Sequence, residues 1–425
     1  MKVFKFGGAS VKDAAAVRNV TSIVSQYSNP LVIVVSAMGK TTNALEEIFN
    51  LRYAGQPYET ALQTCQDYHL GIIKDLFPDV RSEVYTAVNE QFSFLRAYLE
   101  KLLPGNYDEH YDQVVSVGEL VSSIIVQHYL AAQQFKTTWL DCRPLICTDD
   151  SWREAKVDWP NTERNIREKV QPLLTTQLVI TQGFLGGTTQ NRTTTLGREG
   201  SDFTGAIFAY CLRAESLTIW KDVAGFLNAD PKYFENTTKY PQISYHDTVE
   251  MAYYGATVIH PKTIKPLATR HIPLLVKSFL DPAAAGTLIN DNQNEKLIPA
   301  FIRKDQQCLI SFGVRDYTFI SEKNLSVIFH ALADLRFKIN LMQNSAISFS
   351  VCTNYHAERL QLLREQLQEQ FIIHYNTGLL LFTIKNYDEE SIRFLTQARE
   401  ILLEQRTRTT YQFVCRDNEK PKQSI

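Results

Sequence analysis

Short apolar runs alternate with amphipathic stretches between residues 1 and 300 of the chain. The runs are aliphatic and almost continuous, and the clearest are Leu31–Ala37, Leu178–Gly183, Leu217–Val223 and Pro273–Val276. Such runs predict parallel strands buried on both faces, and the intervening stretches, such as Ala14–Gln26 and Thr60–Leu76, predict helices. The alternation favours a three-layer αβα fold with a mainly parallel sheet. Ligands of such folds bind at the carboxyl ends of the strands, so the polar residues after each strand are the functional candidates.

The pattern changes near residue 305. Residues 80–135 are mostly helical by periodicity, whereas the last 120 or so residues read as short strand and helix units. The expected strands are Leu309–Val314, Lys338–Met342, Ser345–Cys352, Leu379–Lys385 and Thr410–Cys415, and the expected helices are Ser321–Leu335, Glu358–Gln368 and Glu390–Gln405. These units predict one or two small α+β modules.

Composition excludes several classes of protein. The net charge is −2, which provides neither a basic surface for nucleic acid nor a polybasic membrane signal. The seven cysteines are scattered and form no CxxC pair, which favours a reducing cytoplasm over a disulfide framework or a zinc site. We see no signal peptide and no long uninterrupted apolar run, so we expect a cytoplasmic protein with no membrane span.

The opening residues place a lysine inside a strand, directly before a glycine pair. Lys5 precedes Gly7 and Gly8, and Ser10 follows before a helical stretch. Glycines allow backbone N–H groups to approach an anion, the helix that follows directs its positive end toward it, and a lysine adds a point charge. The sequence therefore suggests a phosphate cradle, although a terminal strand with a tight turn is the alternative interpretation.

Two further segments supply small or acidic residues. The loop Val34–Asn43 carries the hydroxyls of Ser36 and Thr42, but Val34 replaces the first glycine of a Walker A loop, so that motif is absent. It is either a substrate contact or a simple loop. Glu119 begins an apolar helix, where it either complements the helix dipole or binds an ammonium group.

Two later segments join charged residues to turns. Residues 197–202 combine Arg198, Ser201 and Asp202 with two glycines, which suits either a helix N-cap or a turn that binds a carboxylate. The segment 219–234 places its charged and aromatic residues around turns, where they could hold a nucleotide; these are Lys221, Asp222, Phe226 and Lys232.

Six motifs in this order resemble those of the aspartate kinases (aspartokinases), members of the amino-acid kinase family. The motifs are KFGGAS from Lys5, VVSA from Val34, GEL from Gly118, TLGREGSD from Thr195, DVAGFLNADP from Asp222 and MAYYGATVIHP from Met251. The resemblance covers residues 1–290 strongly, and the tail resembles the paired ACT regulatory modules of the family. It implies a catalytic domain at residues 1–297, a first ACT-like module at 305–376 and a shortened second module at 377–425.

The resemblance implies a reaction in which MgATP phosphorylates the side-chain carboxylate of L-aspartate, the first step toward lysine, threonine and methionine. Lys5, Gly7, Gly8 and Ser10 would contact the phosphates, with Lys221, Asp222, Phe226, Lys232 and Thr257 along the nucleotide. Asp202 would orient Lys5. Arg198 and Glu119 would bind the α-carboxylate and α-ammonium of aspartate, beside Ser36, Thr42 and Ser201. Mg²⁺ would be held by phosphate oxygens, with no side-chain ligand.

The chain departs from the family pattern at several positions. Ala9 replaces Thr or Ser, Glu199 replaces Gly or Asn beside Arg198, where it is expected to lower aspartate affinity, and Thr257 replaces a frequent lysine. In the tail, Asn340, Met342 and Ser345 match an effector-binding segment, but Asn340 replaces a frequent Asp. These departures motivate the alternative of a degenerate kinase kept as an amino-acid-sensing partner; a kinase of the same fold with another acceptor is a further alternative. The resemblance also implies pairing of two or more copies through the ACT-like modules.

Overall fold

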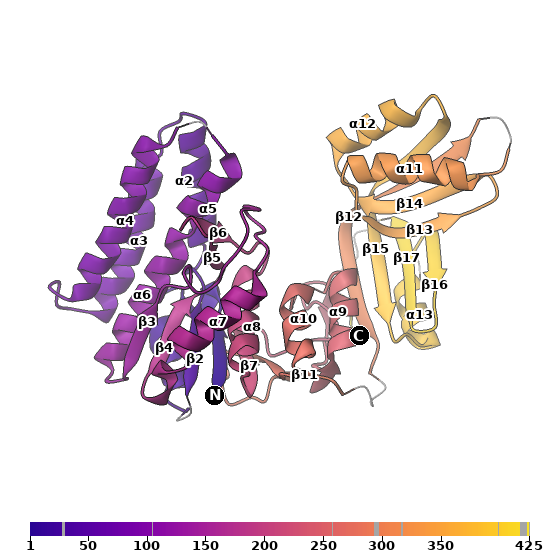
Figure 1. The fold of residues 1–425 in the computed structure, drawn as a ribbon. Helices are drawn as coiled ribbons and strands as arrows, with labels where there is room; N and C mark the ends of the chain where they lie inside the picture. The colour runs from indigo at the N-terminus through magenta and orange to yellow at the C-terminus, as the bar shows by residue number, and fades with distance from the viewer. Residues whose placement is uncertain are drawn as a thin grey trace. The chain divides into compact units, whose positions relative to one another are not determined.

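The computed structural model describes residues 1–27, 30–103, 105–256, 258–292, 297–315, 318–397, 399–416 and 423–424. The chain divides into two compact units (Figure 1). The first contains Met1–Phe226, Pro241–Val249 and Val258–Gln293, and the second contains Leu227–Tyr240, Glu250–Thr257 and Asn294–Ile425.

An eight-stranded sheet forms the centre of the first unit, within the described residues. Its order is β3-β4-β2-β1-β7-β10-β11-β9, and every neighbouring pair is parallel except β10 with β11. The strands are β1 (Lys2–Phe6), β2 (Leu31–Val35), β3 (Thr137–Leu140), β4 (Leu178–Gln182), β7 (Ser216–Lys221), β9 (Gln242–Ser244), β10 (Leu274–Ser278) and β11 (Thr287–Asn290). The prediction of a mainly parallel sheet is confirmed.

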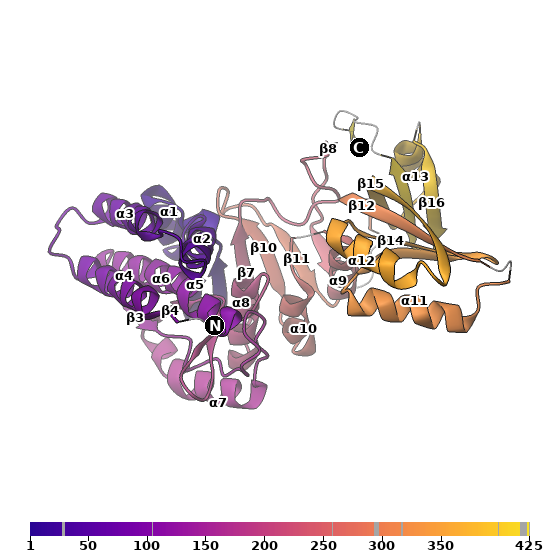
Figure 2. The ribbon, with the colours of Figure 1, turned by 90° about the horizontal axis from the view of Figure 1, so that it is seen from above.

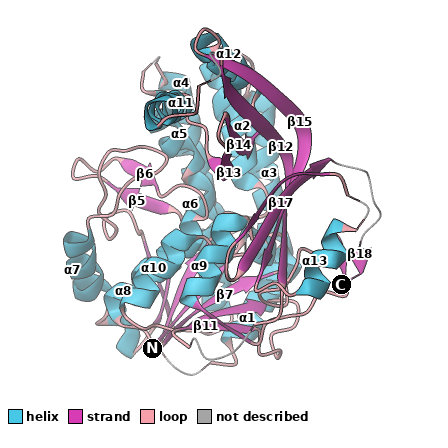
Figure 3. Cartoon of the chain, turned by 90° about the vertical axis from the view of Figure 1, so that its right-hand side faces the viewer, coloured by secondary structure: helices cyan, strands magenta, loops and turns pink. Residues whose placement is uncertain are grey.

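Helices cover both faces of this sheet, as the cyan and magenta elements in Figure 3 show. One face packs against α1 (Ala14–Val24), α2 (Thr41–Tyr53), α3 (Glu59–Leu76), α4 (Glu83–Lys101), α5 (Tyr107–Val115) and α6 (Val117–Ala132). The other face carries α8 (Gly200–Leu212), which packs against α7 (Trp159–Val170) and α10 (Pro261–Thr269). Because strand residues alternate between faces, Phe4 and Phe6 join the first core, whereas Lys5 lies toward α8.

The continuous helical stretch Tyr107–Ala132 is long and apolar enough to cross a membrane by length and composition alone. In the fold, 78% of its apolar window is buried against the rest of the protein. That burial is typical of a core helix.

The second unit contains a six-stranded antiparallel sheet of order β13-β14-β12-β15-β17-β16, seen from above in Figure 2. Its two long central strands, β12 (Ala300–Val314) and β15 (Phe371–Lys385), pair from Ala300 to Val314. Helices α11 (Glu322–Asp334) and α12 (Ala357–Leu367) pack on one face around Phe312. The other strands are β13 (Ile339–Asn344), β14 (Ser348–Asn354), β16 (Ile401–Arg406) and β17 (Thr410–Arg416).

The predicted helix Glu390–Gln405 is wrong in its second half. Helix α13 spans only Glu389–Thr396, and Ile401–Arg406 forms strand β16. A capping box between Asp388 and Ser391 starts the helix. Residues 401–406 instead pair with strand β17, which buries Leu403 beside Val414. Pairing in the sheet thus overrides local helix propensity. The last module reads strand, helix, strand, strand.

The remaining elements are short. The hairpin β5 (Leu185–Gly187) and β6 (Thr193–Thr195) precedes α8, and β8 (Phe234–Glu235) pairs with β18 (Gln423–Ser424). Helix α9 spans Tyr245–Tyr254, and short 3₁₀ turns occur at Gly8–Val11 and Leu173–Thr175.

Candidate active site

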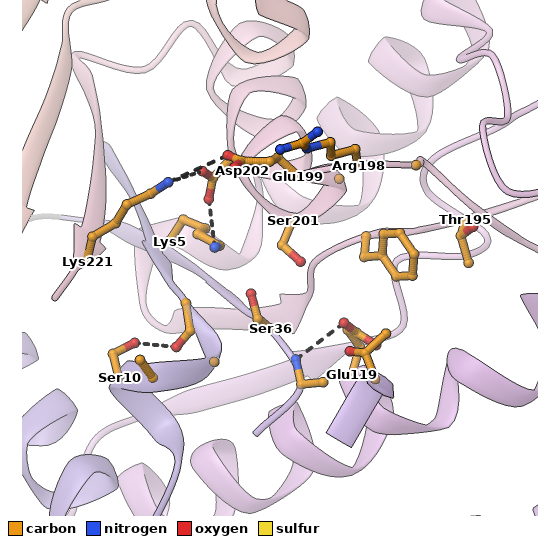
Figure 4. Close-up of a pocket in the computed structure, with 18 of the residues that line it drawn as sticks. Lys5, Ser10, Ser36, Glu119, Thr195, Arg198, Glu199, Ser201, Asp202 and Lys221 are labelled. Atoms are coloured by element: carbon orange, nitrogen blue, oxygen red, sulfur yellow. Dashed lines mark hydrogen bonds and ion pairs between the residues drawn. The ribbon is translucent and has the colours of Figure 1, made fainter. Parts of the chain in front are cut away.

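A cavity of about 640 Å³ opens at the carboxyl ends of the central strands of the first unit. Its walls come from the segments that follow β1, β2, β4 and β7, together with the start of α8 and of α6 (Figure 4). Twelve of the residues predicted from the sequence line it: Lys5, Gly7, Gly8, Ser10, Ser36, Thr42, Glu119, Arg198, Ser201, Asp202, Lys221 and Asp222.

Two lysines and two carboxylates meet on one side of this cavity. Lys5 Nζ lies 2.6 Å from Asp202 Oδ1, and Lys221 Nζ lies 3.1 Å from Asp202 Oδ2. Lys221 also lies 3.5 Å from a carboxylate oxygen of Glu199 and donates to the Val258 carbonyl. The neighbouring strands β1 and β7 bring the two lysines together, and α8 supplies Asp202 in its first turn. We call these four side chains the lysine–carboxylate cluster.

The protonation states within the cluster follow from burial and charge. Burial opposes ionisation of Asp202, but Lys5 and Lys221 outweigh it and lower the pKa of Asp202 to about 2. Burial tends to lower the pKa of Lys221, yet Asp202 and Glu199 raise it overall. The pKa of Glu199 is raised, first by burial and then by the charge of Asp202. The cluster therefore pairs Asp202 with two lysines, and burial together with the charge of Asp202 favours the protonated form of Glu199.

The glycine turn after β1 allows two loops to approach closely. A Cβ on Gly8 would lie 2.8 Å from the Ala37 carbonyl oxygen and 2.9 Å from that of Gly39. Both neighbours are backbone atoms, so a side chain cannot be accommodated without moving the loop. The Ser10 hydroxyl donates to the Gly7 carbonyl and closes the turn. The turn thus packs directly on the loop that carries Ser36.

A buried glutamate lies across the cavity from the cluster (Figure 4). Glu119 is 3% exposed, and its Oε1 accepts a hydrogen bond of 3.3 Å from the Ala37 backbone N–H. Its Oε2 contacts no donor among the described residues. Burial raises the pKa of Glu119 to about 8. A buried carboxylate with one unsatisfied oxygen at a cavity wall is suited to bind a cationic group.

Arg198 lies beside Glu199 and Asp202, exposed at the turn before α8 (Figure 4). It makes no ion pair within the described residues, so its guanidinium is available to a carboxylate ligand. The sequence puts Glu199 next to Arg198, but the Glu199 carboxylate pairs with Lys221 instead. Its charge therefore acts on the lysine side of the cavity. The lower aspartate affinity expected from Glu199 stays a prediction.

Among the described residues, the other predicted ones do not line the cavity. Phe226 is 1% exposed, with its N–H bonded to the Thr287 hydroxyl. Lys232 belongs to the second unit, and Thr257 lies outside the described residues. In the second unit Asn340 is nearly buried and bonded to Lys304, Gln307 and Asn354, whereas Met342 and Ser345 are exposed.

The structure adds wall residues that sequence reasoning missed. Phe184 lines the cavity in a left-handed conformation, with φ of +69°, held by the Thr204 hydroxyl on its N–H. Tyr111, Arg153 and Thr195 also line it. Left-handed conformations are rare for phenylalanine and arginine, and no sequence pattern marks these positions. In the sequence, Thr195 was identified only as the first residue of a motif and not as a site residue.

The carboxylates were also considered as metal ligands. Both oxygens of Asp202 face lysines, so it is a poor ligand. Asp222 lines the cavity and makes no ion pair within the described chain, so it could approach a cation bound to phosphate.

Comparisons with known proteins match this architecture. A model described as the amino acid kinase family matches residues 1–278. Lysine-sensitive aspartokinase 3 of Escherichia coli is 32% identical over 351 residues, which are 82% of this chain and 77% of the relative. A chloroplastic bifunctional aspartokinase/homoserine dehydrogenase 2 of Arabidopsis thaliana is 29% identical over 382 residues, and the chain covers 42% of its length.

Solved structures extend the match to both units. Escherichia coli aspartokinase III in complex with aspartate and ADP has a TM-score of 0.81 at 26% identity, covering 98% of this chain and 96% of that chain. The same protein in complex with lysine and aspartate has a TM-score of 0.82 at 27% identity, covering 97% and 95%. The fold predicted from the sequence is therefore confirmed, including the antiparallel ACT-like region.

Proposed function

The chain belongs to the amino acid kinase family and, within it, to the aspartokinases, and we propose that it transfers the γ-phosphoryl group of MgATP to the side-chain carboxylate of L-aspartate. The products are 4-phospho-L-aspartate and ADP. The observation that carries this proposal is a single cavity with a lysine-rich side beside a glycine turn, an opposite side with Glu119, and the exposed Arg198 in its wall. The aspartate and ADP in the E. coli relative support the same pair of ligands.

The phosphate side neutralises charge. The β-carboxylate of aspartate and the γ-phosphate are both anions, so catalysis depends mainly on positioning and electrostatic stabilisation. Lys5 would contact the transferring group, and Asp202 would hold the Lys5 ammonium in place. Gly7 and Gly8 would present backbone N–H groups, beside Ser10, and Lys221 and Asp222 would lie along the nucleotide. The nucleophile is already ionised, so no strong general base is required.

The acceptor side recognises a zwitterion. Arg198 would grip the α-carboxylate, because a guanidinium matches a carboxylate bidentately. Glu119 would pair with the α-ammonium through its unsatisfied oxygen. Ser36, Thr42 and Ser201 would complete the pocket. Mg²⁺ bound to ATP would offset phosphate charge, with Asp222 as the residue able to hold it.

We further propose a catalytic domain at residues 1–297 and ACT-like modules at 305–376 and 377–425. We also propose that Phe226, Lys232 and Thr257 lie near the nucleotide, and that the protein is cytoplasmic and assembles from two or more copies. An amino-acid effector near Asn340, Met342 and Ser345 is supported by the lysine complex of the E. coli relative. Because the Asn340 amide is already engaged, an effector would have to displace Lys304 or contact Met342 and Ser345.

A hydroxamate assay tests the function directly. Purified protein with MgATP, L-aspartate and hydroxylamine should accumulate aspartyl hydroxamate, because hydroxylamine traps the acyl phosphate. Lys5→Ala should lower kcat by at least about a hundredfold, whereas Lys12→Ala, an exposed lysine outside the cavity, should stay within about twofold. Wild-type protein that yields no hydroxamate at millimolar aspartate would refute the proposal, and would favour the degenerate-kinase alternative.

A further inference from the structure

One carboxylate outside the predicted set joins two walls of the cavity. Asp112, on α5, is 0% exposed. Its Oδ2 accepts the backbone N–H groups of Arg153 at 3.0 Å and Thr195 at 2.8 Å, and its Oδ1 accepts the Thr195 hydroxyl at 2.7 Å. Asp112 does not itself line the cavity, but Arg153 and Thr195 do.

The two loops that Asp112 contacts include left-handed residues and are joined directly by the hydrogen bond from the Ala155 N–H to the Thr195 carbonyl. Arg153 has a φ of +66° and Gly197, just after Thr195, has a φ of +77°. Left-handed conformations cost free energy for residues such as arginine and persist when surrounding contacts fix them. Both loops also touch each other, because Glu154 and Arg153 crowd the position of a Cβ on Gly197. Asp112 therefore fixes the approach of the segment that ends in Arg198.

The same residue ties this segment to the helix of Glu119. The Asp112 carbonyl accepts the Ser116 N–H at the corner between α5 and α6, and Glu119 lies in the first turn of α6. Asp112 thus contacts, through its side chain and its main chain, the elements that carry Arg198 and Glu119. None of its contacts reaches the lysine–carboxylate cluster.

We propose that Asp112 is a positioning residue that sets the spacing between the carboxylate-binding arginine and the ammonium-binding glutamate. This inference rests on the proposed function, in which those two side chains bind the acceptor amino acid. It assigns Asp112 to aspartate recognition and not to nucleotide binding.

Two substitutions separate hydrogen bonding from a general effect on folding. Asp112→Asn retains an oxygen for the two backbone N–H groups and gains an NH₂ group that can donate to the Thr195 hydroxyl, so its contacts can all be satisfied. Asp112→Ala removes all three of the hydrogen bonds that the Asp112 side chain accepts. We expect Asp112→Ala to raise KM for aspartate by at least about tenfold, and Asp112→Asn to stay within about threefold of wild type. The affinity for ADP, measured by calorimetry, should change by less than about twofold in both variants.

Asp108→Ala is the matched control on the same helix. Asp108 contacts the Arg153 guanidinium at 3.4 Å but not the backbone, so its loss should leave KM for aspartate within about twofold. An unchanged KM in Asp112→Ala, or an equal loss of ADP affinity, would overturn the inference. An Asp112→Asn variant as impaired as Asp112→Ala would also overturn it.

A further pair keeps the test decisive if Asp112→Ala does not fold. Thr195→Val removes the hydroxyl donor to Asp112, and Thr195→Ser retains it. We expect KM for aspartate to rise several-fold in the valine variant only, and equal values in the two variants would contradict the inference. Failure of the proposed function is recognised separately, because wild-type protein would then form no aspartyl hydroxamate.

Discussion

Glu199→Gln tests whether the lysine–carboxylate cluster controls nucleotide affinity. In the structure Lys221 is shared between Asp202 at 3.1 Å and Glu199 at 3.5 Å, and Lys221 and Glu199 side chains are 19% and 24% exposed. An incoming phosphate must compete with both carboxylates for this ammonium. Replacing Glu199 by the neutral amide leaves the shape of the turn and removes one competitor.

The magnitude follows from the separation and the exposure. Two unit charges 4 Å apart near a protein surface interact by about 4 kcal/mol, whereas exposed pairs measured in proteins contribute about 1 kcal/mol or less. Because this pair is partly screened, we take ~1 kcal/mol as the gain to nucleotide binding, which is about fivefold in Kd for ADP. KM for aspartate should stay within about twofold.

The pH dependence has a definite sign. The pKa of Glu199 is already raised in the free protein, by burial and by Asp202, and a bound phosphate would raise it further. Nucleotide binding should then take up a proton, so ADP affinity is highest when Glu199 is protonated and falls as pH rises through the pKa of Glu199 in the free protein. Glu199→Gln should flatten this dependence.

Calorimetry of ADP binding in buffers of different ionisation enthalpy measures both the affinity for ADP and the number of protons taken up on binding. Glu154→Gln is the control, because Glu154 lines the same cavity but pairs with Lys262. An unchanged ADP affinity with a lower KM for aspartate would show that Glu199 acts on Arg198, as its sequence position suggests, and would refute the reasoning from the structure.

Two other substitutions address the acceptor side and the glycine turn. Glu119→Gln should raise KM for aspartate by at least about tenfold, since it removes the charge that pairs with the ammonium group. In wild-type protein the affinity for aspartate should rise as pH approaches about 8, because Glu119 must lose a proton before it binds the ammonium group. If the pH dependence of aspartate affinity were the same in the glutamine variant, this role of Glu119 would be contradicted. Gly8→Ala should abolish ADP binding or lower the melting temperature, because the added Cβ would lie 2.8 and 2.9 Å from two backbone oxygens. Gly71→Ala is the control and should do neither, because the space around Gly71 is open. Equal behaviour of the two glycine variants would refute the argument that Gly8 is required by the close approach of the loops.

In the first unit, β3 and β11 are partly exposed and were not predicted, whereas the strands buried on both faces were predictable. Each such strand is marked by an apolar run, and the observed β2 and β4 lie within the predicted ranges. The second unit was harder, because its antiparallel strands alternate between faces and resemble amphipathic helices over short lengths. Residues 401–405 were therefore assigned to a helix, although pairing with β17 makes them part of strand β16.

The cavity likewise contains residues that could be predicted from the sequence and residues that could not. Residues that follow strands, such as Lys5, Ser36 and Lys221, could be selected from the sequence because strand ends converge at one edge of a parallel sheet. Asp112 and Phe184 could not, because their positions depend on contacts between segments distant in sequence. Asp112 meets Thr195 across 83 residues, and Phe184 is held by Thr204.

Two of the departures from the family pattern, Ala9 and Glu199, line the cavity. Ala9 lines the cavity within the 3₁₀ turn Gly8–Val11, and that turn is intact because Ser10 supplies the hydroxyl that closes it. Glu199 engages Lys221, while Lys5 keeps its 2.6 Å contact with Asp202. Glu119 and Arg198 also line the cavity, and neither has a side-chain partner among the described residues. Under the proposed function these two substitutions would affect nucleotide affinity, while the residues proposed for phosphoryl transfer and for aspartate binding all line the cavity, which argues for a working kinase over a degenerate one.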